Sequence, residues 1–177
     1  MSTPMSEVDA LRIDLKGMSA DDAQLHFTLT DDFFAAVEAG DIHRGRVDVE
    51  LHIHRTTERY FDLRFQLGGD VVVQCDRCLD DLTQAVEADS TLVVKFGAEY
   101  AEDDNLITVD ETDGTLDVSW LVYEMIVLAL PIKHVHAPGE CNAAMTELLS
   151  EHSGAVRSSD EAETDPRWEA LRNLVEN

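Results

Sequence analysis

The chain has few cysteines, few lysines and no long apolar run, and each shortage narrows what the protein can be. Three cysteines in 177 residues are too few for a disulfide framework, and beside a polar, acidic start they favour a reducing compartment. The longest apolar stretch, 121–132, is interrupted by Glu124 and is too short to cross a bilayer. We therefore expect a cytoplasmic protein that does not contact membranes.

Motifs of the common enzyme classes are also missing. The sequence contains no glycine-rich phosphate loop, no serine nucleophile elbow and no His-Glu-x-x-His pattern. One enzymatic alternative is a metal-dependent nuclease, since the acidic pairs Asp103–Asp104 and Asp110–Glu111 could bind Mg²⁺. A chain this acidic supplies such pairs by chance, so we expect no enzyme.

Basic residues are scarce as well. The chain has 13 Lys and Arg against 37 Asp and Glu, a formal net charge of −24. Nucleic-acid affinity depends largely on basic side chains that displace counterions, so we expect no DNA partner and leave direct RNA binding open. The only cluster that could form a basic patch is Arg44, Arg46, Arg55, Arg59 and Arg64. Two explanations of the acidity stay open: a basic partner such as a ribosomal protein, or solubility at high internal salt.

Alternation of apolar and polar residues predicts strands over much of the chain. The alternating runs are 8–15, 24–29, 47–54, 61–67, 71–75 and 82–96. Gly68-Gly69-Asp70 reads as a turn between two of them. Asp31 is placed to cap a short helix, with Gly40 as its left-handed terminator.

A second helix is predicted between Asp117 and Pro131, apolar nearly all round. Its expected core face is Val118, Leu121, Val122, Met125, Leu128 and Ala129. A helix of this kind is buried or meets a partner. The fold class that follows is α+β: an antiparallel sheet or partly open β-barrel covered by a buried helix, with a further helix at the C-terminus.

Composition divides the chain into three parts. Residues 1–149 form a single α+β domain, whose motif-bearing part is about 40–149, and residues 150–164 read as an acidic, flexible linker. Asp165-Pro166 then signals a helix over 165–177. Its apolar stripe is Trp168, Leu171, Leu174 and Val175. This helix either docks on the domain or binds a partner, and we favour docking.

The cysteines suggest one candidate metal site. Cys75 and Cys78 lie three positions apart at a strand end, and Cys141 with His136 just before it would complete four zinc ligands. The alternative is a pair of reduced cysteines at a tight turn. Redox chemistry is disfavoured, although Arg77 between the thiols would lower their pKa, because no helix begins at the motif. Zinc is thus the one candidate cofactor, and none is established by the sequence.

Three motifs occur in a characteristic order. They are Cys75-Asp76-Arg77-Cys78-Leu79, then the helix end Leu128-Ala129-Leu130-Pro131, then Asp165-Pro166-Arg167-Trp168. At this separation the series resembles the YceD-like family, also called the large ribosomal RNA accumulation proteins, over roughly residues 40–175. Some members of that family carry more cysteines after the Leu-Pro helix, whereas this chain has only Cys141 there.

The resemblance implies a cytoplasmic ribosome biogenesis factor, bacterial or plastid, that supports accumulation of 23S ribosomal RNA and is not an enzyme. Its implied partner is a ribosomal protein or a pre-ribosomal particle. Arg77, inside the cysteine motif, and Glu124, the lone charge of the apolar helix, are our candidate partner-binding residues. A zinc-stabilised binding module with another cytoplasmic role is the alternative.

Overall fold

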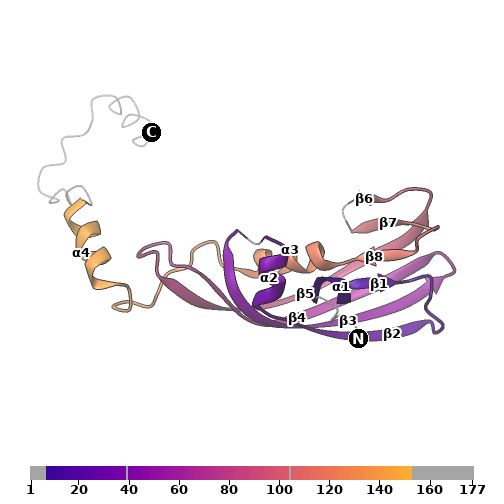
Figure 1. The fold of residues 1–177 in the computed structure, drawn as a ribbon, viewed down its shortest axis with the longest axis horizontal. Helices are drawn as coiled ribbons and strands as arrows, with labels where there is room; N and C mark the ends of the chain where they lie inside the picture. Colours follow the sequence, from indigo (N-terminus) through magenta and orange to yellow (C-terminus); the bar gives the residue numbers. More distant parts are fainter. Residues whose placement is uncertain (1–6, 39, 104, 153–177) are drawn as a thin grey trace, which may run out of the picture.

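One long, curved β-sheet forms most of the molecule, with α1, α2 and α3 on one of its faces and α4 beyond one end (Figure 1). The computed structural model describes residues 7–38, 40–103 and 105–152. The strands are β1 (Arg12–Asp14), β2 (Asp22–Leu29), β3 (Ile42–Thr57), β4 (Tyr60–Gln74), β5 (Asp81–Gly97), β6 (Ala101–Asp103), β7 (Leu106–Asp110) and β8 (Thr115–Asp117). The helices are α1 (Glu7–Ala10), α2 (Asp31–Ala36), α3 (Ser119–Ala129) and α4 (Ala143–His152).

The central strands follow the alternation of the sequence. In β3, β4 and β5 the apolar residues share one face, where Val49 pairs with Leu67 and Leu67 with Ala88. The opposite face carries the polar residues, such as Asp48 and Gln66, and is called the outer face below. Because side chains alternate across a strand, the period of two buries one face and leaves the other in water.

The sheet is mixed, so the prediction of a wholly antiparallel sheet is corrected. Its order is β2-β3-β4-β5-β7-β6, and β5 pairs with β7 in parallel. After β5 the chain forms the edge strand β6. β7 then runs antiparallel to β6 and lies between β6 and β5, so it is parallel to β5. β2 and β6 are opposite ends of the order, so the six strands do not close into a barrel. β1 and β8 form a separate two-stranded sheet.

Helix α3 confirms the predicted helix and lies against β5. Its predicted core face is partly wrong. Val122, which the prediction includes, is fully buried. Ile126 and most of Tyr123 are buried too, although the prediction omits both, and the predicted Leu128 is 84% exposed. Since α3 is apolar nearly all round, its period alone does not fix which side meets the sheet. The helix is rotated so that positions 122, 123 and 126 face the core.

The turn predicted at Gly68-Gly69-Asp70 is also wrong, because β4 runs unbroken through it. A Cβ atom on Gly69 would lie 2.1 Å from the Arg46 carbonyl oxygen. The backbone of β3 therefore passes too close for a side chain, and glycine here serves a close strand contact. Gly40 is not the left-handed end of α2 either; Glu38, with φ of 52°, takes that conformation.

Two other expectations meet a different local structure. The run 8–15, expected as one strand, forms α1 and then β1. Asp31 does not cap α2, since its carboxylate accepts the backbone N–H of Gly45 at 2.9 Å. Helix α4 was not predicted, and it reaches into the first three residues of the range expected as a linker. The rest of that linker and the helix expected at 165–177 lie outside the described residues.

Within the described ranges, no helix is long and apolar enough to span a membrane. The core forms where α1, α2, α3 and the β1–β8 pair cover the buried face of the long sheet (Figure 1). At one end of the molecule the sheet extends beyond this cover, and there the chain carries the cysteine motif and α4.

Candidate metal centre

The first half of the centre is the tight turn after β4. The Cys75 N–H donates to the Asp80 carbonyl at 2.9 Å, and the Leu79 N–H donates to the Cys75 carbonyl at 2.9 Å. Leu79 adopts the left-handed conformation, φ of 64°, that closes such a turn. Cys75 and Cys78 are both buried, so the turn directs two thiols inward.

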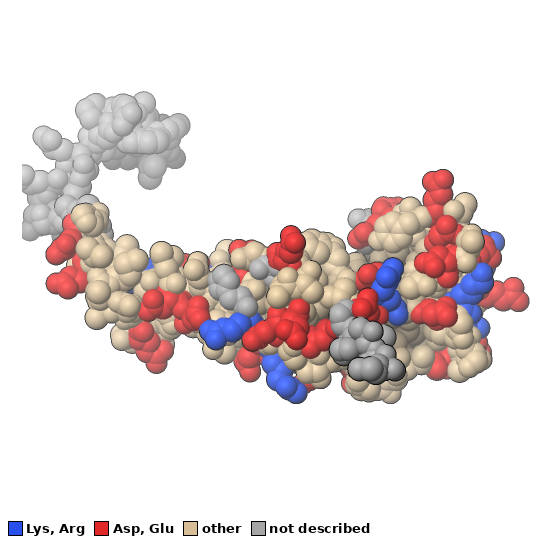
Figure 2. Space-filling model, viewed as in Figure 1, with Lys and Arg blue, Asp and Glu red and all other residues tan. Residues whose placement is uncertain are grey.

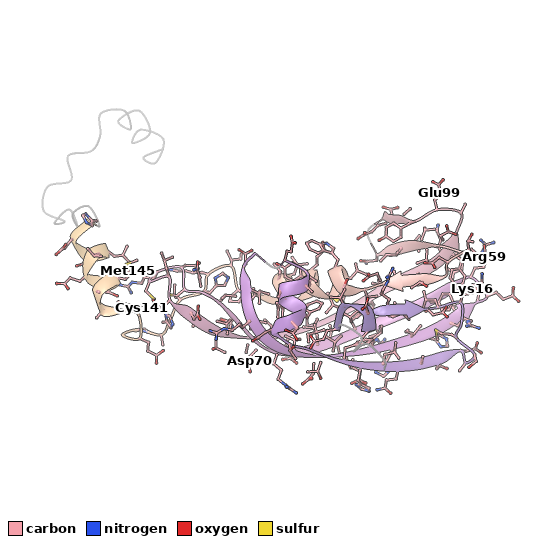
Figure 3. All side chains as sticks on the ribbon, in the orientation of Figure 1. Lys16, Arg59, Asp70, Glu99, Cys141 and Met145 are labelled. Carbon is pink, nitrogen blue, oxygen red and sulfur yellow. The ribbon has the colours of Figure 1, made fainter. Side chains whose placement is uncertain are left out.

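The second half is the segment that follows α3. Pro131 ends the helix, and the chain then runs beside the cysteine turn. The Asp76 N–H donates to the His134 carbonyl at 2.8 Å, and the His134 N–H donates to the Asp76 carboxylate at 2.7 Å. These two bonds fix the segment and bring His136 and Cys141 to the turn. Figure 3 places Cys141 near the base of α4.

The structure brings together the four residues predicted as zinc ligands. Ligand atoms of Cys75, Cys78, His136 and Cys141 all lie within 4.8 Å of one another. The Cys75 and Cys141 sulfurs are 4.0 Å apart, and the Cys78 sulfur is 3.3 Å from His136 Nδ1. Tetrahedral zinc would place two sulfurs about 3.8 Å apart, and a sulfur and a nitrogen about 3.6 Å apart. The donor set and its spacing fit zinc with little movement.

The imidazole of His136 is oriented by a backbone group. Its Nδ1 faces Cys78, while its Nε2 lies 3.1 Å from the Asp81 carbonyl oxygen and donates to it when Nδ1 is a ligand. Such an outer hydrogen bond fixes the tautomer and makes the ligand nitrogen more basic. No residue type predicts this contact, because every residue has a backbone carbonyl.

The electrostatics favour one ionised sulfur. Burial raises the pKa of Cys75, but the backbone N–H groups of Cys78, His136 and Arg77 outweigh it and lower the pKa to about 6. The hydrogen bond with Cys75 raises the pKa of His136. Burial, and then the neighbouring Cys75 and Cys78, raise the pKa of Cys141. A metal ion would displace the protons that remain, so its uptake would release protons and weaken in acid.

The geometry of the centre does not identify the protein's family, but a comparison with protein-family models does. Residues 63–175 match the model described as large ribosomal RNA subunit accumulation protein YceD. The chain belongs to the YceD family. The matched range includes the whole cysteine turn, α3 and Cys141. No curated protein and no solved structure is significantly similar to the chain. Membership in this family implies a role in ribosomal RNA accumulation and ribosome biogenesis.

Other candidate residues of this YceD family member have ordinary surroundings. His52 and His54 both lie on β3, and they contact the carboxylates of Glu50 and Asp22 at 2.6 and 2.7 Å. Glu124 is exposed and accepts the indole N–H of Trp120 at 2.7 Å. Arg77 is exposed on the cysteine turn. Among the described residues, the Cys/His group is the one cluster with metal-ligand geometry.

Proposed function

We propose that the chain is a non-catalytic ribosome biogenesis factor of the cytoplasm, which supports accumulation of 23S ribosomal RNA by binding a basic ribosomal protein or a ribonucleoprotein that contains one. The observation that carries the partner class is an acidic groove on the outer face of the sheet. The family supplies the process in which such binding would act.

The groove is a hollow of about 570 Å³ across β2, β3, β4 and β5. Gly68 lies at its floor and contributes no side chain. Four carboxylates line it: Asp48, Glu50, Glu87 and Asp89. A concave acidic surface concentrates field lines and attracts cationic side chains from a partner. A lysine or arginine of a basic protein would meet several carboxylates at once.

A second hollow of about 690 Å³ continues the outer face toward Asn105, and Gln66 lines both. It contains Asp62 and Arg64 together with His52 and His54. This part of the face is mixed in charge and less acidic. A partner segment lying along the sheet would therefore place its basic residues over the first hollow.

Three of the five arginines in the cluster, Arg44, Arg55 and Arg59, are engaged with other groups of the chain. Arg44 pairs with Asp81 at 2.6 Å, and Arg59 pairs with Glu111 at 2.7 Å. Arg55 donates to the Met18 carbonyl. Figure 2 shows acidic side chains spread along the molecule, with few basic ones between them. These pairings favour contact with a protein over contact with the phosphate backbone.

The metal centre has a structural role in this proposal. Cys75, Cys78, Cys141 and His136 would hold one zinc ion with all four positions filled by protein. A closed site of this type leaves no place for substrate or an activated water, so it stabilises the fold without catalysis. It joins the end of β4 to the segment after α3. Arg77 and Glu124, both exposed, are further candidates for partner contact.

Depletion of the protein in its own cells tests the role directly. We expect the ratio of 23S to 16S ribosomal RNA to fall, and to recover when the wild-type chain is supplied. An unchanged ratio would refute the proposed function. It would leave the alternative, a zinc-stabilised binding module with another role, which the four-residue cluster favours independently.

The metal is tested separately, on protein purified without added zinc. We expect about one zinc per chain by elemental analysis, and a loss of most of it in Cys141→Ser and His136→Ala. His54→Ala is the control, because this histidine is exposed and lies outside the cluster. Well under one equivalent in the wild-type chain would rule out the zinc site.

A further inference from the structure

An apolar groove lies between the end of α3 and the end of β4. It has a volume of about 450 Å³, with Leu128, Leu130 and Ile132 on one side and Val73 on the other. Leu128 is 84% exposed and Ile132 is 104% exposed, the highest values among the large apolar side chains that the structure describes. Two neighbouring side chains this open to water mark a surface that a further element covers.

The groove is held open by its surroundings. Leu130 leaves α3 in an extended conformation, with φ of −68° and ψ of 141°. The paired bonds between Asp76 and His134 then fix the following segment against the cysteine turn. These two bonds hold the segment at the end of the groove that lies beside the cysteine turn.

We propose that the groove is filled by the chain's own segment 166–175. The sequence of this segment predicts an apolar stripe of Trp168, Leu171, Leu174 and Val175. The segment has two arginines, Arg167 and Arg172, against one acid, Glu169, so its net charge is +1 in a chain whose net charge is −24. The groove is lined by the carboxylates of Asp41 and Asp76. Apolar anchors with basic flanks therefore match apolar walls with an acidic rim.

The tether between the described chain and the segment is thirteen residues long. Thirteen residues separate His152, the last described residue, from Pro166, and an extended chain of this length spans up to about 45 Å. A linker of this kind gives a local concentration on the order of millimolar, so a weak contact suffices. The segment lies in the range 63–175 that matches the family model, as do the groove's lining residues other than Gly40 and Asp41. The inference does not depend on the ribosomal role.

The test uses the full chain with Trp120→Phe, so that Trp168 is the sole tryptophan. If Trp168 lies in the groove, its emission is shifted to shorter wavelength and acrylamide quenches it several-fold less than a free peptide of residues 163–177. Adding Leu128→Ser and Ile132→Ser should raise quenching to the level of the peptide. Both side chains are exposed, so the fold should survive, as circular dichroism can verify. Tyr100→Ser is the control, an exposed apolar residue outside the groove.

Three outcomes would overturn the proposal. If acrylamide quenches Trp168 in the Trp120→Phe chain as strongly as it quenches the free peptide, the segment does not dock. Protection that survives the double serine variant places the segment elsewhere. The third outcome is a dimer that forms as the concentration rises, detected by sedimentation. If the double serine variant abolishes both this dimer and the protection of Trp168, the groove receives a second copy of the chain.

Discussion

Leu79 closes the cysteine turn at a backbone cost. Its φ of 64° lies in the left-handed region, which costs a residue with a Cβ atom roughly 1–2 kcal/mol, and its side chain is 57% exposed. Glycine avoids this cost but loses about 0.5–1 kcal/mol through the entropy of the unfolded chain. We therefore expect Leu79→Gly to be at least as stable as the wild-type chain in guanidinium unfolding at equal zinc content.

Leu79→Val is the matched comparison, since a β-branched residue fits the left-handed conformation worst. We expect its free energy of unfolding to be about 1 kcal/mol below that of the wild-type chain. If valine were tolerated as well as glycine, the conformation of this turn would not be the one described.

His54 reports on the outer face through its pKa. The hydrogen bond from its Nδ1 to the Asp22 carboxylate, 2.7 Å long, raises the pKa of His54 above its ordinary value of about 6.5. A raised pKa means that the pair contributes to stability below about pH 6.5, and that the contribution is lost as the pH rises through the folded-state pKa. Both groups are exposed, so the effect on unfolding should be small.

The expected result is an NMR titration midpoint above 6.5 for His54, which Asp22→Asn moves back toward the ordinary value. Asp62→Asn should move the midpoint less, because the Asp62 carboxylate affects the pKa of His54 only through its charge. An equal response to both variants would contradict the hydrogen bond described for Asp22.

At the scale of elements, the close approach of β3 and β4 depends on Gly69. A Cβ atom there would meet the Arg46 carbonyl oxygen at 2.1 Å and the Val47 Cα at 2.7 Å, and both belong to backbone. Backbone in a paired strand does not move cheaply, so we expect Gly69→Ala to lower the free energy of unfolding by about 2–3 kcal/mol. Chemical denaturation measures this change.

Gly68→Ala provides the control in the same strand. The nearest atom to its Cβ would be the Val86 carbonyl oxygen at 4.0 Å, an ordinary contact. We expect a change within about 0.5 kcal/mol, and a gain is possible because alanine restricts the unfolded chain. If the two alanine variants lost equal stability, the effect would come from glycine content and not from the strand contact.

The elements that the sequence predicts well are those whose pattern has a single solution. Strands β3 and β4 alternate over many residues, so the face that holds Val49 and Leu51 must be buried together. The same logic fails at Gly68-Gly69, because a glycine pair signals a turn and a close strand contact equally well. Local pattern also does not predict that β7 pairs in parallel with β5, because β6 lies between them in the sequence but not in the sheet.

Helix α3 shows a second limit of predicting structure from sequence. The residue types of α3 predict its bounds but not its rotation, so the predicted core face includes Leu128, which is exposed, and omits Tyr123, which is buried. The cysteine centre was predictable in its residues, because few side chains bind zinc, and the spacing of Cys75 and Cys78 is informative. Its orientation by the Asp81 carbonyl was not, since only the fold determines which carbonyl faces His136.

At the scale of the molecule, the acidic groove and the metal centre are formed by different residues. The cysteine centre and α4 lie at one end, whereas Lys16, Arg59 and Glu99 lie at the other (Figure 3). The acidic groove of the outer face is formed by β2–β5 and shares no lining residue with the apolar groove beside the centre. Partner binding and zinc binding can therefore be disrupted independently, which makes separate variants informative.

The last prediction separates the two explanations of the net charge of −24. We compare Glu87→Lys/Asp89→Lys, which changes the acidic groove, with Glu99→Lys/Glu102→Lys, which changes the net charge equally outside it. If the groove receives a basic protein, only the first pair should weaken capture of purified large-subunit ribosomal proteins, by about tenfold or more at low salt. The difference between the pairs should shrink as KCl rises, because salt screens exposed charges.

Adaptation to high salt predicts another pattern. The two pairs would then behave alike in capture, and the melting temperature of the wild-type chain would rise steadily toward molar KCl, as repulsion among its carboxylates is screened. The stability measurement alone does not decide, since screening stabilises any chain of this charge to some extent. The comparison of the two pairs decides, because they share a net charge and differ only in where the carboxylates lie.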